Sequence, residues 1–267
     1  MAAVEESAWD GDWYLRATYD DGGTLGSIHD SECQIDSIAQ SWAVLSKAGD
    51  PARSRRAMQS VLERLVCPQD RLMQLFTPPF DKTTRDPGYI KGYQPGTREN
   101  GGQYTHAATW TAWAFTTLSD GKQAGALFDL LNPIFQSDTR EKADVYRVEP
   151  YVICADIYSQ PPFVRRGGWT WYTGSAAWMH RLGLEAILGF KKIGNTLQID
   201  PVIPPDWDGF EIRYRFGESV YLVQIHNPEH VASKVREMQL DEQPLNGGSI
   251  PLVDDHQEHR VVVTLGK

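Results

Sequence analysis

The amino-acid sequence predicts a mainly α-helical protein followed by a small antiparallel β module. Up to about residue 190, apolar residues recur at helical spacing, whereas after Gly194 they alternate in short runs separated by Gly, Pro, Asn and Asp. The expected strands are the runs TLQID, FEIRYRF, SVYLVQIHN, REMQL and RVVVTL. We therefore divide the 267 residues into a helical domain, 1–192, and a β module, 193–267.

The first two expected helices form an antiparallel hairpin. Residues 35–48 carry an apolar stripe, and the glycine at position 49 suits a helix C-terminus. Asp50 can cap the next helix, 51–66, which begins with proline, a residue favoured at that position. Because the turn between the helices is so short, the two helices are expected to pack side by side.

A long segment rich in Pro and Gly, 68–102, follows the hairpin. Loops of this length are usually functional or disordered, and the aromatic residues here make the segment too apolar for a disordered linker. We expect an ordered loop packed over a site. Beyond it, residues 104–118, 122–131 and 169–188 are expected to form helices, whereas 146–159 suits a helix or a strand.

Composition disfavours several classes of function. The formal net charge is −9, from 26 basic and 35 acidic side chains, whereas nucleic acids and anionic membranes attract basic surfaces. The three cysteines are widely spaced, which is unlike a disulfide framework or a structural zinc site. No secretory signal pattern or apolar run long enough for a membrane helix is present. We therefore expect a cytoplasmic chain that neither binds nucleic acid nor inserts into a membrane.

Four polar clusters lie at expected helix starts or in loops. The first, 30–36, holds three carboxylates that could bind sugar hydroxyls or transfer protons, but acids at a helix N-terminus more often act as caps. The second, 98–106, combines a Gly-Gly pair with His106, which could donate a hydrogen bond to an anion. For His106, we give equal weight to this role and to a packed or capping role.

The other two clusters differ in what they predict. Arg and Glu in 146–151 are typical of a structural ion pair, whereas glycines and hydroxyls in 165–175 could cradle a phosphate through backbone N–H groups. No P-loop, dinucleotide-binding, metalloprotease or serine-hydrolase motif is present. We therefore expect neither a metal nor a cofactor.

Four segments of the sequence resemble the C-terminal part of glycoside hydrolase family 94. Within that family they are most similar to the phosphorylase-like domain of cyclic β-1,2-glucan synthases, and they also resemble 1,2-β-oligoglucan phosphorylases. The segments are ECQIDSIAQSW (32–42), ENGGQYTHAATW (99–110), RGGWTWYTGSAAWM (166–179) and PPDWDGFEIRYR (204–215).

The resemblance implies that the chain is the C-terminal portion of an (α/α)6 barrel with a β module behind it. It also implies inverting phosphorolysis of β-linked gluco-oligosaccharides, in which an aspartic acid protonates the glycosidic oxygen while inorganic phosphate attacks the anomeric carbon. The phosphate-binding candidates are His106, Thr173, Gly174 and Ser175. The substrate-binding candidates are Glu99, Asn100, Tyr104, Glu32 and Asp36.

One departure from the family affects the expected activity. The general acid of the family lies in a G-D-W-N-D-G motif ahead of the matched region, and this sequence lacks that motif. We therefore expect no catalytic residue in the chain, no activity on its own, and a partner that is either the missing N-terminal half or a second copy. Full-length synthases of this type would be attached to the inner membrane.

Two alternatives remain at this stage. The chain could be a non-catalytic carbohydrate-binding or barrel-completing subunit. Less favoured is an inverting β-glycosidase that uses Glu32 or Asp36 together with Glu99, because a hydrolase needs a second carboxylate to activate water.

Overall fold

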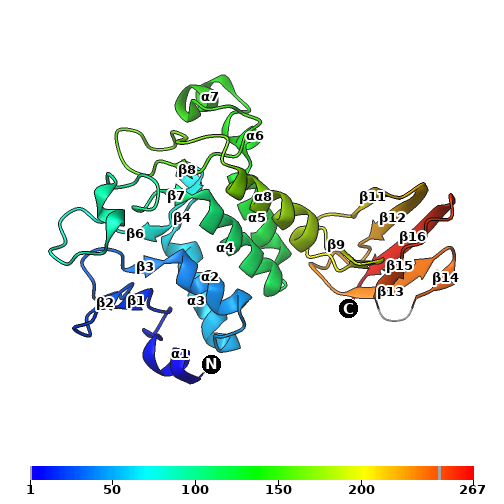
Figure 1. The fold of residues 1–267 in the computed structure, drawn as a ribbon, viewed down its shortest axis with the longest axis horizontal. Coiled ribbons are helices and arrows are strands. Elements are labelled where there is room, and N and C mark those ends of the chain that lie inside the picture. Colours follow the sequence, from blue (N-terminus) through cyan, green and yellow to red (C-terminus); the bar gives the residue numbers. More distant parts are fainter. Residues whose placement is uncertain (1, 246–247) are drawn as a thin grey trace. The chain divides into compact units, whose positions relative to one another are not determined.

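The computed structural model describes residues 2–245 and 248–267, which form two compact units (Figure 1). The first unit contains residues up to 114 and residues 127–180, and the second contains 115–126 and 181–267. None of the helices in the described residues is long and apolar enough to cross a bilayer.

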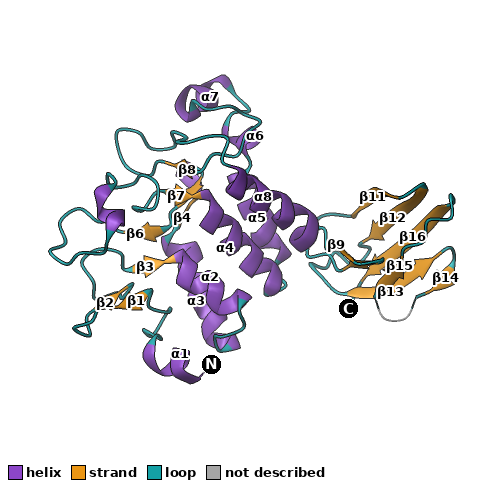
Figure 2. Ribbon diagram, in the orientation of Figure 1, coloured by secondary structure: helices purple, strands orange, loops and turns teal. Residues whose placement is uncertain are grey.

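The prediction of a mainly α-helical fold is wrong. Of the residues that the structure describes, 33% are helical and 24% are in strands, which makes this a mixed α/β structure (Figure 2). Much of the region expected to be helical consists of loops, which are joined by strands only two residues long. Pairing of such short strands leaves no alternating pattern in the sequence, because it depends on backbone groups brought together by the tertiary structure.

The described residues contain eight α-helices. They are α1 (Ala2–Ser7), α2 (Ser37–Leu45), α3 (Pro51–Arg64), α4 (Thr105–Thr117), α5 (Gly121–Leu131), α6 (Pro133–Gln136), α7 (Arg140–Tyr146) and α8 (Thr173–Arg181). The expected hairpin is present as α2 and α3, and the Asp50 side chain accepts hydrogen bonds from the backbone N–H groups of Ala52 and Arg53. Capping of this kind satisfies donors that the first turn of a helix leaves free.

Four pairs of short strands order the loops of the first unit. They are β1 (Ala17–Thr18) with β2 (Thr24–Leu25), β3 (Ile35–Asp36) with β6 (Phe76–Thr77), β4 (Val66–Cys67) with β5 (Leu72–Met73), and β7 (Gln103–Tyr104) with β8 (Asp156–Ile157). The segment 68–102 also contains the 3₁₀ turns η1 (Pro68–Asp70) and η2 (Tyr89–Gly92). The segment 146–159 is therefore mostly irregular, with β8 as its strand.

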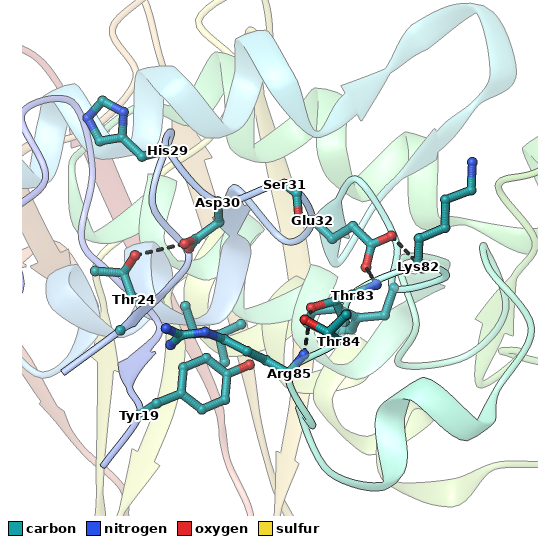
Figure 3. A pocket seen from close by; sticks show the side chains of 13 residues that line it. Tyr19, Thr24, His29, Asp30, Ser31, Glu32, Lys82, Thr83, Thr84 and Arg85 are labelled. Carbon is teal, nitrogen blue, oxygen red and sulfur yellow. Dashed lines mark hydrogen bonds between the residues drawn. The ribbon is translucent and has the colours of Figure 1, made fainter. Parts of the chain in front are cut away.

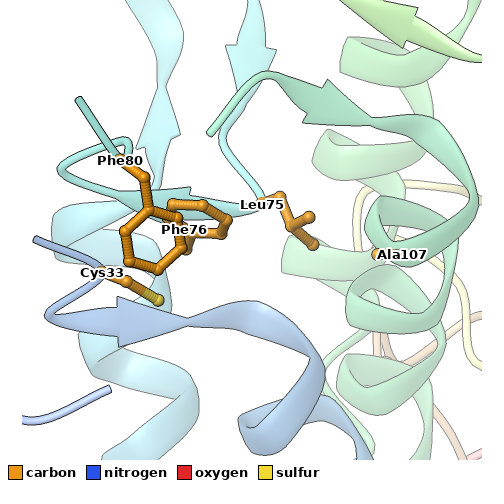
Figure 4. Packing of buried hydrophobic residues seen from close by; sticks show 5 residues of the cluster. All are labelled: Cys33, Leu75, Phe76, Phe80 and Ala107. Atoms are coloured by element: carbon orange, nitrogen blue, oxygen red, sulfur yellow. The ribbon is translucent and has the colours of Figure 1, made fainter. Parts of the chain in front are cut away.

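An apolar cluster anchors the long segment 68–102 to α4. Its buried members come from that segment, from α4 and from the loop before β3, and they lie close together in Figure 4. Phe76 and Phe80 pack with ring centroids 5.1 Å apart. The cluster consists of Cys33, Leu75, Phe76, Phe80 and Ala107.

The helix expected over 169–188 begins later and ends differently. Trp171 has a left-handed backbone with φ of 59°, which an α-helix cannot include, so α8 begins at Thr173. After Arg181 the chain continues as a π-helical turn, Leu182–Ile187.

The second unit contains two sheets. The three-stranded sheet has the order β15-β10-β9 and the five-stranded sheet the order β11-β12-β16-β13-β14. The bounds are β9 (Phe190–Ile193), β10 (Thr196–Ile199), β11 (Gly209–Phe216), β12 (Ser219–His226), β13 (Val235–Leu240), β14 (Gln243–Pro244), β15 (Ser249–Pro251) and β16 (Glu258–Leu265).

The expected antiparallel module differs at one pairing, because β12 and β16 pair in parallel, with Val223 opposite Val261. Alternation within a strand places side chains on faces but does not determine the direction of its neighbour. On β12 the alternation appears as expected, since every second residue from Ser219 to Ile225 is buried.

In the second unit, a histidine lies between two carboxylates and links the turns that carry them. His259 Nδ1 lies 2.8 Å from Asp241 Oδ2, and its Nε2 lies 3.1 Å from Asp255 Oδ1. Because both ring nitrogens face acceptors, the protonated imidazolium fits best. The hydrogen bond with Asp241 is the largest cause that raises the pKa of His259 above 6.5, and the bond with Asp255 adds to it.

The raised pKa of His259 predicts pH-dependent stability. A group whose pKa is higher in the folded state stabilises the protein fully below its unfolded pKa, and the stabilisation disappears as pH rises through the folded value. We expect wild type to exceed the His259→Gln variant in melting temperature below pH 6.5, and the difference to shrink at mildly alkaline pH. Thermal denaturation of both proteins, once below pH 6.5 and once at mildly alkaline pH, measures this. A difference in melting temperature that stays constant or grows with pH would contradict the prediction.

Candidate active site

The segment 98–106 leads into α4, and its backbone is held by one amide side chain. Asn100 is fully buried; its Oδ1 accepts a hydrogen bond from Phe80 N at 2.8 Å, while its Nδ2 donates to Phe80 O at 2.9 Å and Tyr93 O at 2.8 Å. These contacts connect the end of the long loop 68–102 to its earlier residues. Asn100 therefore holds the loop together from within, and both of its amide protons are donated to backbone carbonyls.

The Gly-Gly pair in this segment is required by the packing of the protein itself. Gly101 has φ of 78°, and a Cβ there would lie 2.9 Å from the Pro79 side chain. A Cβ on Gly102 would lie 3.0 Å from the backbone oxygens of Arg98 and Gly96. The sequence predicts that these glycines let the backbone approach a ligand closely. In the structure they instead let it approach neighbouring segments of the protein.

A buried carboxylate that the sequence analysis did not identify joins the two halves of the candidate site. Asp156 is 1% exposed, and its Oδ2 accepts from Arg98 N at 3.0 Å while its Oδ1 accepts from Trp169 N at 3.2 Å. A Cβ on Gly168 would lie 2.3 Å from Asp156 Oδ1, so glycine is required beside it. Burial raises the pKa of Asp156, against the effect of the two backbone donors. In the sequence, Asp156 could have been identified as an acidic residue within an otherwise apolar run.

Glu99 and Tyr104 present polar groups beside each other. Arg98 Nε and Glu99 Oε2 are 3.6 Å apart, which is longer than a hydrogen bond, and neither atom has a hydrogen-bond partner among the described residues although both are buried. Burial, and next the Glu99 carboxylate, raise the pKa of Tyr104 to about 12. Tyr104 therefore keeps its proton at neutral pH and can donate it in a hydrogen bond. Arg98 Nε and Glu99 Oε2 attract each other as an ion pair, but buried polar atoms that lack hydrogen bonds are rare in proteins, and these two suit a polar ligand.

His106 lies beside two tryptophans, one on α4 and one on α8, whose rings also contact each other. The centroid of its ring is 4.7 Å from that of Trp110 and 5.8 Å from that of Trp178, and these contacts fix its orientation. A Cβ built on Gly174 would lie 3.8 Å from His106 Nδ1, so this glycine leaves room beside the imidazole. His106 Nε2 is buried and has no hydrogen-bond partner within the part of the chain that the structure describes. Burial lowers the pKa of His106, which favours the neutral ring.

The other phosphate-binding candidates occupy the first turn of α8. The first turn of a helix carries free backbone N–H groups and a partial positive charge, both of which attract anions. Thr173 is exposed at the first position of α8, and Gly174 follows beside His106. Ser175 is fully buried and its hydroxyl donates to Tyr172 O at 3.1 Å, which places its oxygen against the backbone.

Glu32 lies in a different place, in the wall of a cavity at the other side of the long loop (Figure 3). Its carboxylate accepts hydrogen bonds from the backbone N–H groups of Asp81, Lys82 and Thr83 at 2.8–3.1 Å. Burial raises the pKa of Glu32, but these three donors outweigh it and hold the pKa below its usual value. The side chain is thus an anchor for the turn that begins at Asp81.

The carboxylate of Asp36 also interacts with other groups of the protein. It is 1% exposed, caps α2 by accepting from Ile38 N at 2.7 Å, and forms an ion pair with Arg16. Burial raises the pKa of Asp36 although Arg16 lies against it. The structure therefore brings together Glu99, Tyr104 and the phosphate-binding candidates around α4 and α8, and leaves Glu32 and Asp36 in the supporting loops.

Comparison with known proteins identifies the family to which the chain belongs. A model described as the glycosyl hydrolase 94 superfamily, catalytic domain, matches residues 1–189. The chain is 51% identical over 223 residues to a cyclic β-(1,2)-glucan synthase of Rhizobium meliloti, which is 84% of this chain and 8% of that protein. It is 31% identical over 268 residues to an N,N'-diacetylchitobiose phosphorylase of Vibrio proteolyticus, which is 99% of this chain and 33% of that protein.

A more distant relative is the 1,2-β-oligoglucan phosphorylase of Listeria innocua, at 25% identity over 187 residues, 63% of this chain and 17% of that protein. The chain spans a third or less of the length of these three relatives. The resemblance seen in the four sequence motifs is thereby confirmed. The chain belongs to the glycosyl hydrolase 94 superfamily, a family of carbohydrate-active glycosyltransferases and phosphorylases.

Proposed function

We propose that the chain forms the phosphate- and sugar-binding part of the active site of a β-glucan phosphorylase or cyclic β-1,2-glucan synthase. Its substrates are β-linked gluco-oligosaccharides and inorganic phosphate. The observation that carries the proposal is the position of the His106 ring beside Gly174, in the first turn of α8. A Cβ on Gly174 would lie 3.8 Å from His106 Nδ1, and Nε2 of the same ring has no hydrogen-bond partner among the described residues. The names of the relatives, a β-1,2-glucan synthase and several phosphorylases, support the choice of substrates.

In the proposed mechanism, phosphate occupies the first turn of α8. The backbone N–H groups there, the Thr173 hydroxyl and one N–H of neutral His106 donate hydrogen bonds to it. Phosphate attacks the anomeric carbon from the face opposite the leaving oxygen, the glycosidic bond breaks, and the configuration inverts. Phosphate is itself the nucleophile, so no carboxylate is needed to activate water.

The sugar is oriented from the other side of the candidate site. The Glu99 carboxylate can accept hydrogen bonds from sugar hydroxyls, and Tyr104 can donate one because it keeps its proton. The leaving oxygen must receive a proton, and we propose that the donor is an aspartic acid in a G-D-W-N-D-G segment outside this sequence. On this proposal the chain is inactive by itself and acts in the cytoplasm, where its three free cysteines stay reduced.

A second candidate function, a barrel-completing subunit, is favoured by exposed aromatic side chains. Tyr151, Trp169 and Trp171 are 75%, 66% and 67% exposed. Large exposed apolar side chains that lie close together are typical of surfaces covered by a partner. The partner on this reading is a second chain that covers these side chains.

Replacing Thr173 with Val tests the phosphate site. A hydrogen bond to a charged group contributes about 1.5–3 kcal/mol, so phosphate binding should weaken by roughly 10- to 150-fold. Calorimetric titration with phosphate measures the affinity, and Thr18→Val, which removes an exposed hydroxyl from β1, is the matched control. Equal phosphate affinities for the Thr173→Val variant and wild type would overturn the assignment.

A further inference from the structure

A cavity of about 610 Å³ lies in the first unit, apart from His106 and α8. It is open to solvent on one side and lined by two segments, 19–32 and 80–85, whose side chains face each other in Figure 3. Its volume is within the range of about 300–1,000 Å³ that is usual for small-molecule sites.

Three of the charged side chains that line this cavity are already paired within the protein. Glu32 holds three backbone N–H groups, and Asp30 accepts from the Thr24 hydroxyl at 2.7 Å and from Ser27 N at 2.8 Å. Arg85 contacts Asp21 at 3.1 Å and lies 5.1 Å from the centre of the Tyr19 ring. With these three groups engaged, and with Lys82 directed away from the other labelled side chains in Figure 3, the wall does not select a strongly charged ligand.

Three hydroxyl groups that line the cavity are available to form hydrogen bonds with a ligand. The hydroxyls of Tyr19, Ser31 and Thr84 line the cavity and make no hydrogen bond to any residue that the structure describes. Each can donate one hydrogen bond and accept others, which matches the hydroxyls of a sugar. Leu25 and Phe80 add apolar surface suited to the C–H face of a sugar ring.

The walls of the cavity are fixed before any ligand arrives. Glu32 ties the turn at Asp81 to the segment 19–32, and Asn100 holds the backbone of Phe80 through two hydrogen bonds. A preformed site loses less entropy on binding than a flexible one. The contact between Phe80 and Asn100 also connects the cavity to the segment that carries Glu99.

We propose that this cavity is a second saccharide-binding site, which holds a non-reacting part of a neutral gluco-oligosaccharide chain. The proposal rests on the proposed function for the choice of sugar. The cavity binds the chain through Ser31 and Thr84 on opposite walls, while phosphate occupies the first turn of α8.

The double variant Ser31→Ala/Thr84→Val tests the proposal, because both residues are exposed and their loss leaves the fold intact. Titration calorimetry of the full chain with sophorose and longer β-1,2-gluco-oligosaccharides should show affinity about tenfold weaker than wild type, from two lost hydrogen bonds. The matched control, Ser233→Ala/Thr264→Val, removes two hydroxyls from the second unit and should bind like wild type.

Phosphate titration of the same proteins separates this proposal from the proposed function. The cavity variant should bind phosphate like wild type, whereas Thr173→Val should lose phosphate but keep the oligosaccharide. Oligosaccharide affinity that is equal in wild type and the cavity variant, or no binding of oligosaccharide by wild type at millimolar concentration, overturns the second site. A wild-type chain that binds the oligosaccharide but not phosphate would overturn the proposed function and leave the cavity proposal standing.

Discussion

Incubated alone with β-1,2-gluco-oligosaccharides and phosphate, the chain is expected to release no measurable glucose 1-phosphate. The leaving sugar would have to depart as an alkoxide, and general acid catalysis typically contributes about 10²–10⁴-fold. The buried carboxylates Asp36 and Asp156 are held by protein groups, and Glu32 is held by three backbone amides. None of these three is free to protonate a glycosidic oxygen.

Adding a separately produced segment with the G-D-W-N-D-G motif should restore release of glucose 1-phosphate if the two parts assemble. The same mixture made with the Thr173→Val chain is the control, and it should be less active at limiting phosphate. Robust phosphorolysis by the chain alone that is lost in Glu99→Gln would show that the acid lies within this sequence.

Replacing Asp156 with Ala is expected to destabilise the first unit by about 2–4 kcal/mol. The substitution leaves the partly buried backbone N–H groups of Arg98 and Trp169 without acceptors, and an unsatisfied buried group costs about 1–3 kcal/mol. Asp156→Asn keeps one acceptor and should lose less. Because Asp156 holds the segment of Glu99 to the segment that leads into α8, the variant should also bind phosphate more weakly.

Urea denaturation of the Asp156 variants measures the free energy of unfolding. The control is Asp206→Ala, at an exposed position, which should stay within about 0.5 kcal/mol of wild type. An Asp156→Ala variant as stable as that control would show that the carboxylate does not hold the two segments together.

Local signals in the sequence were sufficient for some elements of the fold. The Asp50 cap, with proline after it, predicted the start of α3, and alternation predicted strands such as β12. The paired short strands β3 and β6 were not predictable in this way, because two-residue strands depend on contacts between distant segments. The parallel pairing of β12 with β16 is likewise a property of the sheet as a whole.

The candidate site also has some features that local sequence predicts and others that depend on tertiary structure. The motifs identified His106 and Gly174, and the structure places them beside each other. The motifs did not reveal that Glu32 would be surrounded by backbone amides or that Asp156 would link two loops, because each role depends on loop geometry. The start of α8 at Thr173 depends on the left-handed backbone of Trp171, which its residue type does not predict.

Titration of the histidine rings by NMR tests the phosphate site most directly. The chain has seven histidines, so six serve as internal controls for His106. Without phosphate, the pKa of His106 should lie below 6.5 because the ring is buried. With phosphate at the first turn of α8, the anion should favour the imidazolium and raise that pKa selectively, and Thr173→Val should reduce the rise. A His106 pKa that stays the same with and without phosphate, or that shifts no more than those of the other six, would contradict the site.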